Sequence, residues 1–298
     1  MFALLLAGGL RTFSVTWPLT RESVVDANGG RANFWIGISA PFSGAQHELA
    51  AAARDVCKRE RFDSCDIRLE NASATREFYA GTHRGENAFW SPAADRRSAA
   101  WVQRSFAFQW ESVTRGFQAL ERSGANLDLV VRGRPDVVFL RPLRLERLRA
   151  AIRNQSKEAV VPCAVGPGRL VDDVVIAEPA AMRSYAARLA GPRSVETHVA
   201  NVLKGRYVFQ KVNHAILDFP FVDDYVERAV YKTAHHRLHD RCLAKNTPPS
   251  RRGRDLSAFN ETDLAAVRRY VSRQLEATNS MAVADVGTKR TTNRLNAV

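Results

Sequence analysis

Short apolar runs alternate with longer amphipathic segments over the first two thirds of the chain. The short runs predict strands over Phe2–Ala7, Phe34–Ser39, Asp66–Leu69, Leu127–Val131, Ala159–Pro162 and Val174–Ala177. The segments between them predict helices over Phe13–Asp26 (broken near Pro18), Gln46–Arg59, Ala99–Arg122, Leu143–Ile152, Pro179–Leu189 and Val195–Leu203. Such alternation up to about residue 190 predicts an α/β fold, in which a mostly parallel sheet is covered by helices on both faces.

The pattern changes after residue 205. Asp263–Leu275 has the periodicity of an amphipathic helix, and the chain beyond Thr278 is polar. We therefore expect three parts. These are an α/β domain over residues 1–205, a helical C-terminal extension over 206–278 packed on that domain, and a disordered tail over 279–298.

The charge of the chain favours anionic partners without choosing among them. Its 298 residues carry a formal net charge of +13, and 45% of them are hydrophobic. The basic residues are scattered and no nucleic-acid-binding motif accompanies them, so we interpret the charge as surface composition and expect no nucleic-acid partner. The chain also lacks the GxGxxG, Walker A and GxSxG patterns, which argues against dinucleotide oxidoreductases, P-loop NTPases and α/β hydrolases.

The four cysteines are Cys57, Cys65, Cys163 and Cys242, and they form no CxxC pair. Cys57 and Cys65 could pair, although buried free thiols are the simpler interpretation. Asn-x-Ser/Thr triplets begin at Asn71, Asn154 and Asn260, a number that chance explains in a chain of this length.

The first apolar run, Phe2–Ala7, is too short for the apolar core of a signal peptide. No stretch of the sequence approaches the apolar length that a transmembrane helix needs. The compartment therefore stays open, with the cytoplasm and a Golgi-associated location both compatible with the sequence.

Charged residues interrupt the most strand-like segment of the chain. In "LVVRGRPDVVFL", Arg132, Arg134 and Asp136 lie between two apolar runs. Ligands of open α/β sheets bind beyond the carboxyl ends of the strands. The segments to consider are therefore Gly8–Phe13, the loop after Ser39, Arg132–Asp136 and Asp172-Asp173.

Three segments resemble one known family. They are "LLLAGGLRTF", "LDLVVRGRPDVVFLRPL", and "VDDVVIAEPAAMRSYAARL" followed by "SVETHVANVL". Together they are similar to nucleotide-sugar glycosyltransferases with a GT-A-like, Rossmann-related fold, found in microbes, algae and large viruses. That family has "SGQLRTF", "RTRPDLxF", "VNDRFAIGxxxAMxxY" and a glutamate-led helix in the same order. The resemblance spans about residues 3 to 205, and Arg-x-Arg-Pro-Asp is its most specific element.

The resemblance implies transfer of a sugar from a nucleotide-diphosphate donor to a hydroxyl acceptor on a glycan, lipid or protein. Residues 1–205 would then bind the nucleotide sugar. Arg11, Arg132, Arg134 and Asp136 would hold the donor diphosphate, since a guanidinium binds two phosphate oxygens at once.

The resemblance also implies a divalent ion and a catalytic base. Asp136 and Asp173 would hold Mn²⁺ or Mg²⁺ against the diphosphate. The Arg-Pro-Asp segment has a single carboxylate. Either Asp172, Asp173 or Asp128 completes the ion's ligands, or the arginines replace the ion. Asp173 and Glu196 are the candidates for the base of an inverting transfer.

Each of these residues also has a purely structural interpretation. Pro135-Asp136 suits an ordinary turn, and Glu196 suits the start of a helix. The tract "HHRLHD", His235–Asp240, contains metal-binding residue types but fits a solvated turn. The alternative functions are a non-catalytic nucleic-acid-binding protein, a scaffold that has lost activity, and a phospho- or nucleotidyltransferase.

Overall fold

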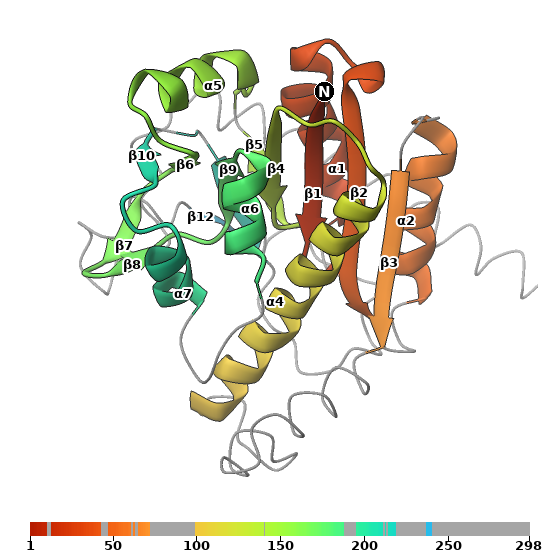
Figure 1. Ribbon diagram of the computed structural model, residues 1–298. Helices are drawn as coiled ribbons and strands as arrows, with labels where there is room; N and C mark the ends of the chain where they lie inside the picture. The colour runs from red at the N-terminus through yellow and green to blue at the C-terminus, as the bar shows by residue number, and fades with distance from the viewer. Residues whose placement is uncertain are drawn as a thin grey trace, which may run out of the picture.

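The computed structural model describes residues 1–10, 13–42, 47–60, 62, 65–71, 99–139, 141–187, 195–210, 212, 214–218 and 237–239. These residues form an α/β structure around a seven-stranded sheet with the order β10-β6-β9-β4-β1-β2-β3 (Figure 1). Its strands are β1 (Phe2–Ala7), β2 (Phe34–Phe42), β3 (Cys65–Asn71), β4 (Leu129–Gly133), β6 (Ala159–Val161), β9 (Val174–Ala177) and β10 (Tyr207–Phe209). The predicted fold class is confirmed.

The sheet is parallel except for one strand. Strands β3, β2, β1 and β4 are parallel neighbours, and β10 is parallel to β6. Only β9, among the strands of this sheet, runs the other way, pairing antiparallel with both β4 and β6. The predicted strands Phe2–Ala7, Phe34–Ser39 and Leu127–Val131 correspond to β1, β2 and β4, which are parallel neighbours in the order β2-β1-β4.

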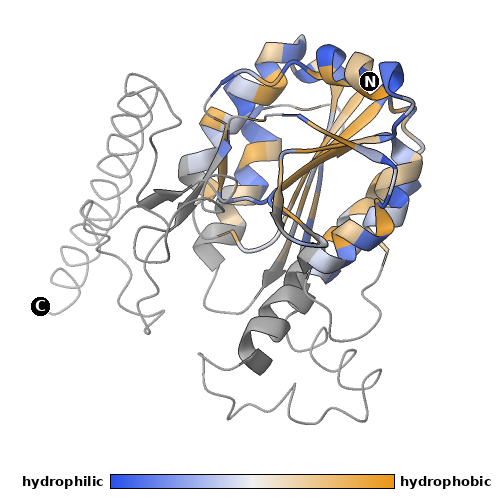
Figure 2. Cartoon of the chain, turned by 90° about the vertical axis from the view of Figure 1, so that its left-hand side faces the viewer, coloured by the Kyte–Doolittle hydropathy of each residue, from blue (hydrophilic) through white to orange (hydrophobic). Residues whose placement is uncertain are grey.

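Helices cover both faces of this sheet, because successive side chains of each buried strand point to opposite sides. On one face, Leu4 and Leu6 of β1 pack with residues of α1 (Phe13–Thr20), α2 (His47–Glu60) and α5 (Leu145–Asn154). On the other face, Ala3 and Leu5 pack with residues of α4 (Ala99–Arg122), α6 (Pro179–Tyr185) and α7 (Val195–Val202). Figure 2 shows hydrophobic strands between helices that carry both hydrophobic and hydrophilic residues.

Two smaller sheets complete the described part. One has the order β12-β11-β5, with β5 (Val137–Phe139), β11 (His214–Asp218) and β12 (Arg237–His239). The other pairs β7 (Ala164–Gly166) with β8 (Arg169–Leu170). The described pieces of the predicted extension are therefore the strands β10, β11 and β12. The predicted helix Asp263–Leu275 and the predicted tail lie outside the described residues, and the three-part division stays a prediction.

The predicted break at Pro18 is wrong. Helix α1 contains Pro18 and continues into a π-helix (Arg21–Val25) and a 3-10 helix (Asp26–Asn28); a second 3-10 helix covers Arg31–Asn33. Pro18 is the sixth residue of α1, so it removes one backbone bond to the carbonyl four residues earlier, and the chain changes to π-helical geometry three residues later without leaving the helix. Buried Phe13 and Trp17 also hold this segment against the sheet.

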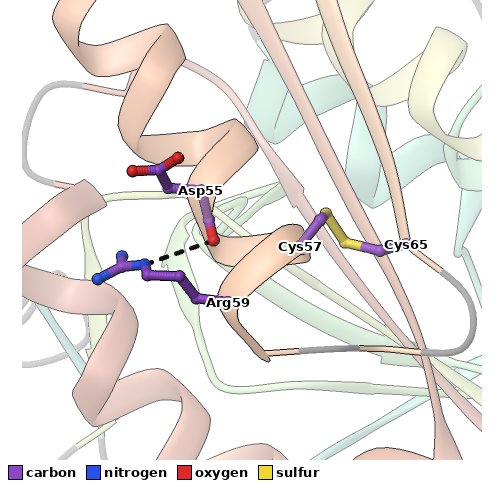
Figure 3. The surroundings of a disulfide bond; sticks show 4 residues. All are labelled: Asp55, Cys57, Arg59 and Cys65. Carbon is purple, nitrogen blue, oxygen red and sulfur yellow. Dashed lines mark hydrogen bonds between the residues drawn. A yellow bond between two sulfur atoms is a disulfide. The ribbon is translucent and has the colours of Figure 1, made fainter.

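The interpretation of Cys57 and Cys65 as free thiols is also wrong. Cys57 of α2 forms a disulfide with Cys65 at the start of β3 (Figure 3). Cys163 is disulfide-bonded as well. The sequence could not decide this point, since pairing depends on how closely the end of α2 approaches β3; the two Cα atoms are 5.7 Å apart.

Within the described residues, no helix combines the length and the apolar character needed to cross a membrane.

Candidate functional site

The reversed direction of β9 brings two distant polar segments together. Gly133, the last residue of β4, pairs with Val174, the first residue of β9. Arg134 therefore lies beside Asp173 at the carboxyl edge of the parallel strands, and its backbone N–H donates to the Asp173 carbonyl oxygen at 3.1 Å. The sequence analysis expected both segments at this edge. The antiparallel pairing supplies the reason for the second one.

Arg134 and Asp136 form a tightly bonded ion pair. Arg134 Nε donates to Asp136 Oδ1 at 2.8 Å, and Nη2 donates to Oδ2 at 2.7 Å. The third guanidinium nitrogen, Nη1, lies 3.7 Å from Asp173 Oδ1. Side-chain exposure is 16% for Arg134, 3% for Asp136 and 0% for Asp173, so the pair is shielded from water.

Burial alone would lower the pKa of the Arg134 guanidinium. The charges of Asp136, Asp173 and Asp172 and the hydrogen bonds from Arg134 to Asp136 outweigh burial, so this pKa lies above its usual value. Arg134 is therefore a permanent cation that the surrounding carboxylates hold in place.

The segment is also a turn, as its structural interpretation predicted. The Val137 N–H donates to the Arg134 carbonyl at 3.1 Å, which closes a four-residue turn through Pro135 and Asp136. Thr16 of α1 donates its hydroxyl to the Pro135 carbonyl at 2.5 Å. Helix α1 therefore fixes the turn that aligns Asp136 with Arg134.

Arg132 has a different environment from Arg134. It lies within β4, not after it as the sequence analysis placed it, and pairs with Leu5 of β1 and Val175 of β9. Its side chain is fully buried. Nη2 donates to the Ala7 carbonyl at 3.4 Å, while Nε and Nη1 are buried without a hydrogen-bond partner in the described part of the chain.

Two neutral hydroxyls are buried on the same face of the sheet. The Tyr185 hydroxyl of α6 and the Ser39 hydroxyl of β2 have no hydrogen-bond partner among the described residues. Burial raises the pKa of Tyr185; the charge of Arg132 lowers it and those of Asp172 and Asp173 raise it, so the phenol stays neutral at physiological pH. These charges act on Tyr185 because the residues lie close together.

Neither Tyr185 nor Ser39 is among the site residues predicted from the sequence. A signal existed for the tyrosine, because it is the last residue of the "AMxxY" segment in the family pattern. Its ring packs against Trp110 of α4, with the ring centroids 4.9 Å apart. Ser39 carried no sequence signal, since it reads as an ordinary strand residue.

The other candidates do not join this cluster in the described residues. Asp128 lies at the opposite edge of the sheet, where it pairs with Arg149 and the amino group of Met1, so it cannot complete an ion site at Asp136. Arg11, His235, His236 and Asp240 lie outside the described residues. Glu196 lies in the first turn of α7, and the position of its side chain is not described.

The arrangement around Asp136 does not fit a divalent ion. The Arg134 guanidinium already binds both Asp136 oxygens and approaches Asp173, so an ion between these carboxylates would lie against a fixed positive charge. No group of three or more His, Cys, Asp or Glu residues in the described ranges is arranged to hold a metal. Arg134 lies between the carboxylates of Asp136 and Asp173, where the resemblance implied Mn²⁺ or Mg²⁺.

Comparison with known proteins gives structural likenesses only. No family model and no curated protein matches the sequence. Mouse xyloside xylosyltransferase 1, in its apo form, is 9% identical, with a TM-score of 0.35 over 70% of this chain and 84% of that one. The mannosyltransferase PcManGT from Pyrobaculum calidifontis, solved with GDP-Man and Mn²⁺, is 11% identical, with a TM-score of 0.42 over 99% of this chain and 80% of that one. Both TM-scores are below 0.5, so neither likeness supports a function for this chain.

Proposed function

We propose that this protein is a glycosyltransferase that moves a sugar from a nucleotide-diphosphate donor to a hydroxyl acceptor. The observation that carries the proposal is Arg132, a fully buried guanidinium at the carboxyl end of β4 whose Nε and Nη1 nitrogens have no hydrogen-bond partner among the described residues. A buried cation with open donors is costly unless it receives an anion. A diphosphate supplies adjacent oxygens that match the fork of a guanidinium.

The cluster gives each charged residue a separate task in this proposal. Arg132 receives the diphosphate. Arg134 cannot turn toward it without leaving Asp136, so Arg134 and Asp136 act as a fixed pair that shapes the edge of the site. Asp173 helps to hold Arg134 in place and does not act as a metal ligand. Arg11 stays a predicted donor-binding residue, placed by the sequence in the loop after β1.

The base for an inverting transfer is better assigned to Glu196 than to Asp173. The Asp173 carboxylate lies 3.7 Å from the Arg134 guanidinium and balances its charge, which makes this carboxylate a weaker base for an acceptor hydroxyl. A general base must come within hydrogen-bonding distance of the proton that it removes. Glu196 belongs to a helix of the same sheet face as Arg132 and Tyr185, and its role stays a prediction for mutagenesis.

Tyr185 and Ser39 provide neutral hydrogen bonds near the same point. A phenol with a raised pKa donates a proton in a hydrogen bond without losing it. In our proposal these hydroxyls bind donor oxygens next to the diphosphate that Arg132 receives. This would satisfy buried polar atoms that have no partner in the described residues.

The test is a thermal-shift panel of UDP-, GDP-, CDP- and dTDP-sugars, run in EDTA and in Mn²⁺, on wild type, Arg132→Met and Arg206→Met. Arg206 is the control, because it is paired with Glu158 away from the site. A donor at a hundred times its dissociation constant should stabilise the wild type by about 2.7 kcal/mol. We expect Arg132→Met to lose this shift and Arg206→Met to keep it.

Absence of a shift with every nucleotide sugar, or an equal shift in Arg132→Met, would refute the proposal. Product analysis separates the alternative enzymes. Release of a nucleoside diphosphate together with a glycosylated acceptor indicates sugar transfer, whereas a phosphorylated or nucleotidylated acceptor indicates the other transferases.

A further inference from the structure

The three cysteines that the structure describes are all disulfide-bonded. Cys57 and Cys65 join α2 to the adjacent strand β3 across a short connection (Figure 3). Cys163, far along the sequence, is also in a disulfide. Disulfides form and persist in oxidising compartments and are rare where glutathione keeps thiols reduced. Such pairing is typical of chains that fold in an oxidising compartment.

That compartment changes the meaning of the triplet Asn154-Gln155-Ser156. In a secreted chain such a triplet is an acceptor for N-linked glycans, provided that it lies at the surface. Asn154 is the last residue of α5, and all three residues are exposed. The helix ends here in a tight turn, in which Ser156 has a φ of 50° and donates its N–H to the Arg153 carbonyl at 3.0 Å.

The triplet also lies away from the candidate functional site. Helix α5 leads into the start of β6, and β6 is parallel to β4, so Asn154 lies near the amino edge of the strands. Figure 1 shows α5 at the same end of the sheet as the N-terminus. Arg132 and Arg134 lie toward the opposite edge, where a glycan on Asn154 would leave the donor site open.

We propose that Asn154 is N-glycosylated while the chain passes through an oxidising secretory compartment. The Nδ2 nitrogen of Asn154 bonds to the anomeric carbon of a glycan carried on a lipid diphosphate. The bond from that carbon to the diphosphate breaks, and the amide nitrogen loses one proton to solvent. The proposal is independent of the proposed transferase activity, since it needs only the exposed triplet and the disulfides.

The test begins with the full chain purified from the cells that naturally produce it. Peptide mapping by mass spectrometry should find the Asn154 peptide carrying a glycan, and converted to aspartate after enzymatic deglycosylation. Thiol labelling of the denatured, unreduced protein should leave Cys57, Cys65 and Cys163 unmodified. An unmodified Asn154 peptide, or free thiols at Cys57 and Cys65, would overturn the proposal.

Variants expressed in the same cells identify the triplet as the cause. Asn154→Gln and Ser156→Gly should each lose one glycan by gel mobility, and glycine suits the positive φ at position 156. Gln155→Ala keeps the triplet intact and should keep the glycan. If Ser156→Gly still carries a glycan on Asn154, the modification does not depend on the triplet and the proposal is wrong.

Discussion

Replacing Asp136 by asparagine separates the two interpretations of the Arg-Pro-Asp segment. Asparagine serves turns about as well as aspartate, so a residue that only shapes a turn should tolerate the change. In the structure, however, Asp136 accepts two hydrogen bonds from Arg134 at 2.8 and 2.7 Å and is 3% exposed. The substitution removes its charge and one of its two acceptor oxygens.

The size of the effect follows from these contacts. Breaking a buried ion pair by removing one partner costs about 3–5 kcal/mol, because the remaining charge is left uncompensated. Here the amide keeps one acceptor, and Asp173 stays 3.7 Å from Arg134. We therefore expect Asp136→Asn to lower the free energy of unfolding by about 2–4 kcal/mol at neutral pH.

Urea denaturation of four proteins measures this effect: wild type, Asp136→Asn, Arg134→Gln and the double variant. The two changes should be non-additive, with a coupling energy of roughly 1–3 kcal/mol, because both singles break the same contact. Asp66→Asn is the matched control. Its partner Arg68 is also two residues away, but both side chains are about one third exposed, so its cost should stay below about 1 kcal/mol.

A value for Asp136→Asn within about 0.5 kcal/mol of wild type would refute this reasoning, because surface turn substitutions fall in that range. So would additivity in the cycle. Either result would mean that Arg134 does not depend on Asp136 and is free to bind a ligand, which would reopen Asp136 as a metal ligand.

Gly116→Val on α4 should lower the free energy of unfolding by about 1–3 kcal/mol, because a Cβ there would lie 2.6 Å from Leu5 Cδ1 and 3.0 Å from Ser39 Cβ. Gln118→Val, at an exposed position of the same helix, is the control. Equal Tm values for the two variants would contradict the expectation. Cys57→Ser should cost about 2–3 kcal/mol through the unfolded state, and a reducing agent should lower the Tm of wild type more than that of the variant, in which only the disulfide of Cys163 is left to reduce. Glu158→Gln should cost less than about 1 kcal/mol in urea denaturation, since the Glu158–Arg206 pair is partly exposed. The hydrogen bond from Arg206 lowers the pKa of Glu158, so the stabilisation from this ion pair is present above pH 4.5 and is lost as the pH falls below it. A stability difference between Glu158→Gln and wild type that persists in strong acid would contradict this prediction.

The sequence by itself determined the elements and their class. Three elements have the predicted boundaries: Phe2–Ala7, Ala99–Arg122 and Val174–Ala177. Their boundaries can be predicted because a buried strand or an amphipathic helix has a characteristic spacing of apolar residues along the sequence. The strand and helix alternation likewise determined the mostly parallel sheet. It also placed Arg134 and Asp136 at the carboxyl edge of the parallel strands.

Only the tertiary structure decided what these residues do there. The apolar pattern of a four-residue strand does not indicate whether the strand runs parallel or antiparallel to its neighbours. The antiparallel pairing of β9 with β4 therefore depends on long-range packing. The same packing buries Arg132 inside β4, brings Asp173 beside Arg134, and brings Cys57 within bonding distance of Cys65. Charge state, partner choice and disulfide pairing depend on distances between segments, and a residue's own neighbours in sequence do not contain that information.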